Sequence, residues 1–129
     1  MIKLSSRQID LLKSGQKHVF RLRLVDYLAS HRDFLNPEAS DEFIAECADK
    51  GLERCSEIGT NLEISITTYS ARCLEYGLDW EEQDRFTVAR EALADTEVAP
   101  DDRIAYMQEC EMIADGEVGD DKWEVIGNA

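Results

Sequence analysis

Hydrophobic positions in residues 59–79 repeat with the period of an α-helix. The large side chains fall at intervals of four, three, four and three residues, at Leu62, Ile66, Tyr69, Cys73 and Tyr76. A strand would need apolar residues at every second position, and this alternation fails at Thr68 and Ser70. Thr60 with Glu63 matches a capping box, and Gly77 stands where a helix commonly ends. We therefore predict a helix here, despite the β-branched residues.

The same spacing predicts four further helices. They cover about residues 5–35, residues 40–58, a segment that starts at Asp79 with Glu82 as its capping partner, and a segment that follows Pro100. Gly15 predicts either a kink in the first helix or its division into two shorter ones. Because the connections are short, the fold class is predicted to be all-α, a bundle of about five mostly antiparallel helices.

Each of these helices has an apolar row that is predicted to face the core, and three of the rows are compared with the structure below. In the first helix the main row is Ile9, Leu12, Val19, Leu22 and Val25, with Phe20, Leu24 and Leu28 on an adjoining row. In the segment after Asp79 the inward residues are Trp80, Phe86, Ala89 and Leu93. In the last helix they are Ile104, Met107, Cys110 and Ala114.

The length of 129 residues is typical of one domain with a single core. We predict a helical domain over residues 1–115 and an acidic tail over residues 116–129, which either docks as a short extension or stays mobile. No apolar run approaches the roughly 18 residues that a membrane span needs, and the first residues lack the apolar segment of a signal peptide. The expected location is therefore the cytoplasm, without membrane association.

The charge is strongly negative and unevenly distributed. The chain has 28 acidic and 14 basic residues and a net charge of −14. Residues 1–30 contain six basic and two acidic residues, so the excess of negative charge lies in the rest of the chain. Binding to nucleic-acid phosphates is disfavoured by such a surface. The charge either serves solubility alone or attracts a protein partner that has a basic face.

Residues that could carry out catalysis are few. Four cysteines form no CxxC pair, and their spacing does not suggest a zinc site, so buried and reduced thiols are expected. The two histidines, His18 and His31, have no motif around them, and no phosphate-binding loop, dinucleotide fingerprint or HExxH motif is present. The sequence predicts a protein that is not an enzyme and that has no cofactor and no metal site.

One pattern in the middle and the C-terminal half resembles a known group of proteins. The stretch "GTNLEISITTYSARCLEYGLDWE", followed by a helix and then "APDDRIAYMQE", is similar to small all-helical accessory proteins encoded in bacterial type VI secretion gene clusters. The resemblance covers roughly residues 1–114, and Trp80 replaces a Phe of the group's pattern. The matching positions are Gly59, Glu63, Tyr69, Gly77, Asp79, Arg103 and Ile104.

The resemblance implies a binding role and supplies no catalytic residues. The leading expectation is an adaptor or co-chaperone that helps to load a toxin effector onto the secretion spike. The alternatives are an immunity protein that neutralises its cognate toxin and a generic helical interaction module. The implied partner is a protein, a toxin effector or its adaptor, with a basic face.

The turn after Gly77 is the predicted partner-binding site, because turns often carry function and aromatic residues dominate interface energies. The candidate residues are Tyr76, Asp79, Trp80, Glu81, Glu82 and Asp84. In the competing interpretation, Tyr76 and Trp80 only fasten two helices together. Residues 115–124, from the end of the helical domain into the acidic tail, are a second candidate surface.

Overall fold

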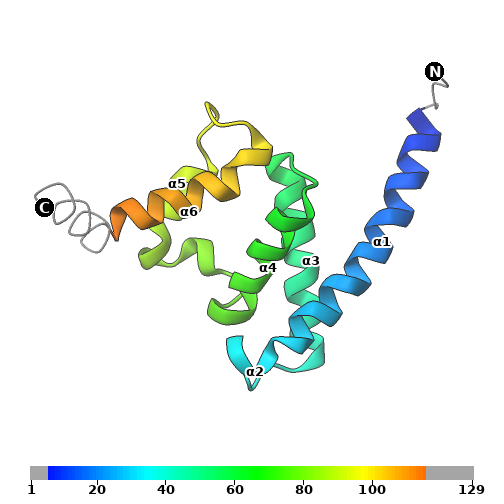
Figure 1. The fold of residues 1–129 in the computed structure, drawn as a ribbon, viewed down its shortest axis with the longest axis horizontal. Helices are drawn as coiled ribbons and strands as arrows, with labels where there is room; N and C mark the ends of the chain where they lie inside the picture. Colours follow the sequence, from blue (N-terminus) through cyan, green and yellow to red (C-terminus); the bar gives the residue numbers. More distant parts are fainter. Residues whose placement is uncertain (1–5, 116–129) are drawn as a thin grey trace, which may run out of the picture.

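The computed structural model describes the backbone of residues 6–115 and the side chains of residues 15–115. All regular elements of this part are helical, which confirms the predicted all-α class (Figure 1). The elements are α1 (Ser6–Ser30), α2 (Arg32–Leu35), α3 (Asp41–Ile58), α4 (Glu63–Tyr76), the 3₁₀ turns η1 (Trp80–Glu82) and η2 (Asp84–Phe86), α5 (Thr87–Leu93), the 3₁₀ turn η3 (Pro100–Asp102) and α6 (Arg103–Ala114). The predicted tail, residues 116–129, lies outside the described residues.

Helix α1 continues through Gly15 without a break. Its buried row is the one with Leu24 and Leu28, which are 2% and 0% exposed. The prediction that Val19 and Leu22 face the core is wrong, because these side chains remain 55% and 50% exposed. Both lie in the C-terminal half of α1, which packs on α3 and α4, but on the side of the helix that faces away from them, while the N-terminal half projects from the body (Figure 1).

Helices α3 and α4 form the closest pair in the fold. Ser40 caps α3, as its position before the helix predicts, and its hydroxyl accepts a hydrogen bond of 3.1 Å from the Phe43 amide. At the centre of the pair, a Cβ atom on Gly51 would lie 1.9 Å from Ser70 Oγ and 3.0 Å from the Ile66 carbonyl oxygen. A residue with a Cβ atom would require Ser70 and the α4 backbone to shift, so Gly51 favours this close approach of the two helices.

The predicted capping box at Thr60 is wrong. Helix α4 begins at Glu63, and Thr60 is a buried residue two positions ahead of its N-cap, Leu62. The Thr60 hydroxyl donates to Asp101 at 2.7 Å and accepts from the Leu62 amide at 3.2 Å. The side chain thus ties the start of α4 to η3 instead of capping a helix.

The predicted helix from Asp79 is replaced by two 3₁₀ turns and the short helix α5. Asp79 makes no side-chain cap, and Gln83 between the turns is extended. In a continuous helix, Trp80 and Phe86 would point in directions about 120° apart. The extended residue lets both rings enter the core, where they are 0% and 8% exposed, and the predicted burial of Ala89 and Leu93 is confirmed.

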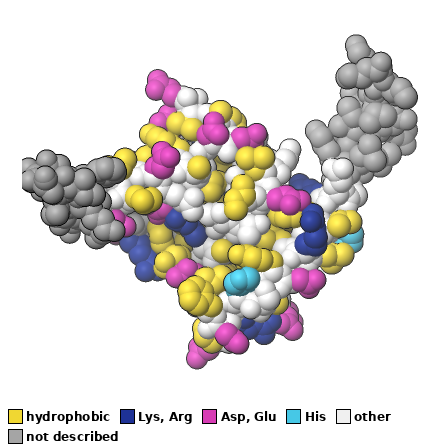
Figure 2. Space-filling model, in the orientation of Figure 1, with side chains coloured by type: hydrophobic (Ala, Val, Ile, Leu, Met, Phe, Trp, Pro, Cys, Tyr) yellow, Lys and Arg dark blue, Asp and Glu magenta, His cyan; other side chains and the backbone are white. Residues whose placement is uncertain are grey.

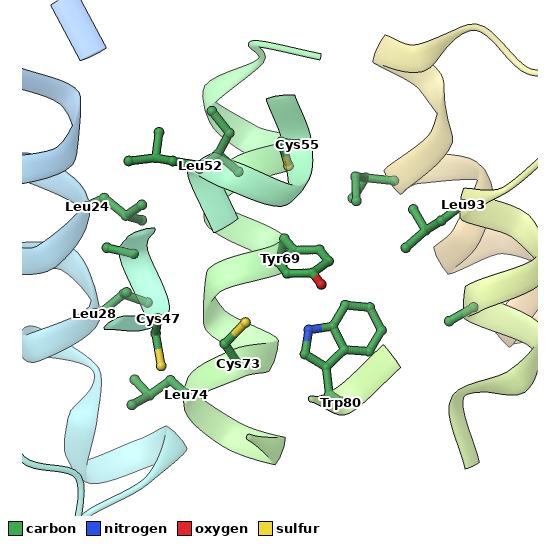
Figure 3. Close-up of a cluster of buried hydrophobic side chains, with 14 of the residues drawn as sticks. Leu24, Leu28, Cys47, Leu52, Cys55, Tyr69, Cys73, Leu74, Trp80 and Leu93 are labelled. Atoms are coloured by element: carbon green, nitrogen blue, oxygen red, sulfur yellow. The ribbon is translucent and has the colours of Figure 1, made fainter. Parts of the chain in front are cut away.

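The last helix is buried only along its first half. Ile104 and Met107 are buried as predicted, whereas Cys110 is half-buried and Ala114 is exposed. Figure 3 shows the centre of the core, where Tyr69, Cys73 and Trp80 meet between α3 and α5. Cys47, Cys55 and Cys73 are buried free thiols, as expected, and burial is the main cause that raises the pKa of each to about 12.

Candidate functional site

The turn after α4 is shaped by Gly77. This residue has φ +108°, a backbone conformation that residues with a Cβ atom rarely adopt. Its amide bonds to the Cys73 carbonyl at 2.9 Å and ends α4. Across the turn, Gln83 Nε2 donates to the Tyr76 carbonyl at 2.8 Å. The predicted end of the helix at Gly77 is confirmed, and the chain leaves it in a defined direction.

Aromatic rings fasten the turn to the core. The Trp80 ring centroid lies 4.9 Å from that of Tyr69 and 5.2 Å from that of Phe86, and Tyr76 lies 4.9 Å from Phe86. The Trp80 indole N–H points toward the Cys73 sulfur (Figure 3). Stacked and edge-to-face aromatic pairs of this kind add stabilisation beyond their buried area. Trp80 therefore acts as an anchor of the turn.

Glu81 extends from η1 into the interior. Its carboxylate, only 12% exposed, accepts hydrogen bonds from Arg54 Nε at 2.8 Å and Arg54 Nη2 at 3.2 Å, and a third from the Tyr69 hydroxyl. Burial alone would raise the pKa of Glu81, but the bonds from Arg54 and Tyr69 lower it below its ordinary value. Burial, reinforced by Glu81, raises the pKa of Tyr69.

Two arginines cover the outer edges of the aromatic cluster. The Arg72 guanidinium lies 5.1 Å from the Trp80 ring centroid and donates to both carboxylate oxygens of Glu111. Arg85 lies 4.6 Å from the Tyr76 ring and 5.2 Å from the Phe86 ring. Cation–π contacts of this geometry hold the arginines against the rings, so α6 and η2 are joined to the same cluster.

The exposed part of the turn is mainly acidic, with Arg85 as its one exposed basic residue. Asp79, Glu82 and Asp84 are exposed, and none of them forms an ion pair with another described residue. The turn backbone beneath them is held by Arg90 Nη1, which donates to the Glu81 carbonyl at 2.7 Å. We call these three side chains the acidic rim. It is a set of free carboxylates on a backbone that is fixed from within.

The six predicted site residues thus separate into three environments. Asp79, Glu82 and Asp84 face solvent, and Tyr76 is half-buried under Arg85. Glu81 is largely enclosed and Trp80 is fully buried. In this conformation the exposed residues among the six are those of the acidic rim, next to Arg85, while Trp80 and Glu81 support the turn from inside.

Sequence reasoning missed Arg54, Tyr69 and Arg85 as parts of this region. Tyr69 was expected in the core, and Arg54 lies on α3, 27 residues before Glu81. The only signal for Arg54 is its place beside the buried row of α3, close to Cys55. No local pattern identifies which of the carboxylates of the chain it meets.

We also looked for a metal site, a membrane-spanning helix and similar proteins of known family or structure. Among the described side chains, those of residues 15–115, no group of three or more His, Cys, Asp and Glu residues is arranged to hold a metal ion. No helix in that part of the chain is both long and apolar enough to cross a membrane. The sequence matches no family model, and neither a curated protein nor a solved structure matches it.

Proposed function

We propose that this chain is a non-catalytic protein-binding factor whose acidic rim contacts a partner with a basic face. The observation that carries the proposal is the rim itself: Asp79, Glu82 and Asp84 are exposed and unpaired among the described residues, on a turn anchored by Trp80 and Glu81. A backbone already held in place loses little conformational freedom on binding. Acidic residues outnumber basic ones two to one, which favours attraction of a basic partner.

The proposed partner is a type VI secretion toxin effector, and the proposed role is that of an adaptor or co-chaperone in effector loading. The support is the resemblance in residues 1–114, whose helix-ending positions include Gly59 and Gly77. Both have positive φ values, 102° and 108°, so these positions require glycine. An immunity protein would use the same acidic surface and is the alternative.

The proposal also covers the arrangement of the helices, the location of the protein and the kind of partner that is not expected. The helices are proposed to form a mostly antiparallel bundle with an acidic tail beyond residue 115. The protein would act in the cytoplasm, where the toxin is made. Nucleic acid is not a proposed partner, since the acidic surface repels phosphates.

Charge reversal of the rim tests the binding site. The triple variant Asp79→Lys, Glu82→Lys, Asp84→Lys should slow association with the isolated partner by about tenfold at low salt, because long-range attraction sets the encounter rate. The matched control reverses three exposed carboxylates elsewhere, Glu38, Glu97 and Glu109. Stopped-flow or biosensor kinetics would give both rates. If the two triple variants slowed association equally, the acidic rim would not be a specific binding site, and the effect would be one of net charge alone.

The role is tested by affinity capture of the tagged chain from its native host, followed by mass spectrometry. Recovery of a toxin together with spike or adaptor proteins would support loading. A toxin in a one-to-one complex with its activity blocked would support immunity. Capture without any secretion protein would contradict both roles.

A further inference from the structure

A groove of about 620 Å³ lies between α1 and α3, on a different part of the molecule from the acidic rim. Its α1 wall includes Lys17 and Arg21, and its α3 wall includes Asp49, Glu53 and Glu57. Leu52 lines it between the two walls. One wall of the groove is therefore positive and the other negative. In Figure 2, basic and acidic side chains lie next to each other at the place where α1 leaves the body.

Only one pair of these charges is already matched. Arg21 Nε lies 2.6 Å from Asp49 Oδ1, and Arg21 Nη2 lies 3.1 Å from Asp49 Oδ2. Lys17, Glu53 and Glu57 are exposed and form no ion pair with another described residue. The groove thus has an inner end closed by an ion pair and an outer part with unmatched charges of both signs.

The N-terminal half of α1 continues past this outer part and projects from the body (Figure 1). Its sequence, residues 6–17, contains three basic residues, one acidic residue and three large apolar residues. This segment therefore has a net charge of +2 and continues from the positive wall of the groove.

We propose that the α1–α3 groove binds the same groove of a second copy of this chain. In a two-fold dimer the same surface of each copy contacts the other, so it must be complementary to itself. A groove with one positive and one negative wall meets this condition, because Lys17 of each copy faces Glu53 and Glu57 of the other. The net charge of −14 opposes self-association elsewhere, and residues 1–30 are where the positive charge is concentrated. This dimer does not depend on the proposed function.

The first measurement is the molar mass of the full chain by sedimentation equilibrium, in a dilution series that reaches about 100 μM. The dimer is expected at the upper concentrations. Two variants then reverse one wall each: Lys17→Glu on α1, and Glu53→Lys with Glu57→Lys on α3. Each alone brings like charges together and should weaken self-association by at least about tenfold.

An equimolar mixture of the two variants supplies the decisive result. In the mixed dimer, the negative α1 wall of one variant meets the positive α3 wall of the other, and the remaining contact keeps its native signs. The mixture should therefore recover the dimer that neither variant forms alone. The control reverses Glu38 and Glu97, exposed carboxylates outside the groove, and should dimerise like the native chain.

Three results would overturn the proposal. They are a native chain that stays monomeric throughout the series, wall variants that dimerise as the native chain does, and a mixture that stays monomeric. Circular dichroism spectra that match the native spectrum would show that a loss of self-association is not a loss of fold.

Discussion

Glu81 differs from its neighbours in the acidic turn because its carboxylate is bonded to Arg54 and Tyr69. A buried ion pair gives little net stability compared with apolar residues, but removal of one partner leaves the other charge without compensation. Arg54 is only 27% exposed, so it would be left in this state. The effect of a substitution at Glu81 therefore arises mainly from the arginine that remains.

The variant Glu81→Gln is expected to reduce the free energy of unfolding by about 2 kcal/mol, below the range for fully buried pairs because this one is partly exposed. The matched control is Glu82→Gln, at the exposed next residue. This control should change the free energy of unfolding by less than about 0.5 kcal/mol. Urea denaturation followed by far-UV circular dichroism measures both. Equal effects at the two positions would contradict a supporting role of Glu81.

The pH dependence of this effect has a definite sign. The folded-state pKa of Glu81 lies below its unfolded-state value of about 4.3. Its stabilising contribution is therefore fully present above that value and is lost as the pH falls through the lower, folded-state pKa. The difference in unfolding free energy between the native chain and Glu81→Gln should be constant near neutral pH and shrink below about pH 4. A difference that does not change with acidity would mean that the carboxylate is not the ionised partner of Arg54.

At the scale of the elements, Gly77 fixes the direction in which the chain leaves α4. Its φ of +108° and ψ of 159° fall outside the region that a residue with a Cβ atom enters easily. The variant Gly77→Ala should lose about 1–3 kcal/mol of unfolding free energy. Gly15→Ala is the contrasting control, since a Cβ atom there meets nothing within 4 Å and alanine favours a helix interior.

Thermal unfolding of the two glycine variants would be compared with that of the native chain. A lower midpoint is expected for Gly77→Ala, and an unchanged or higher one for Gly15→Ala. If the Gly77→Ala variant unfolds at the same midpoint temperature as the native chain, the positive φ is not a requirement of the fold.

Helix existence and several helix ends could be predicted from the sequence, because they depend on nearby residues. The spacing of Leu62 to Tyr76 and the positions of Ser40, Gly77 and Pro100 are local signals of this kind. The errors occurred where a distant contact decided the local structure. Thr60 bonds to Asp101, 41 residues away, and the burial of both Trp80 and Phe86 breaks the predicted helix into turns.

The candidate site shows the same division. The sequence located the turn and its carboxylates, but it could not distinguish the enclosed Glu81 from the exposed Glu82. That difference depends on Arg54, which α3 brings to the turn from the opposite side of the α3–α4 pair. Similarly, the rows of α1 are equally apolar in sequence, and only the packing angle decides that Leu24 is buried and Val19 is exposed.

For the whole molecule, the central thiols report on the cooperativity of the fold. Cys47, Cys55 and Cys73 are 0% exposed, with pKa values raised to about 12. Alkylation requires an accessible thiolate. In native buffer near pH 8, iodoacetamide should therefore modify the half-buried Cys110 first, and the other three only when the core opens.

Mass spectrometry of samples taken over time would resolve this order. The three central thiols should react together and with the same dependence on urea, since they belong to one core cluster. Separate rates for them would instead indicate that the α3–α4 pair opens in parts.

The enclosure of Trp80 gives the molecule an internal optical probe. The indole is 0% exposed and is surrounded by Tyr69, Phe86 and Arg72, so its fluorescence emission reflects a site that excludes water and that iodide does not reach. In a chain with Trp123→Phe, all tryptophan emission would come from beneath the acidic rim. A partner that binds the acidic rim without changing the conformation of the turn would leave the wavelength of this emission unchanged. A partner that unfolds the turn would shift it to the red, so the two modes of recognition can be distinguished by a spectrum.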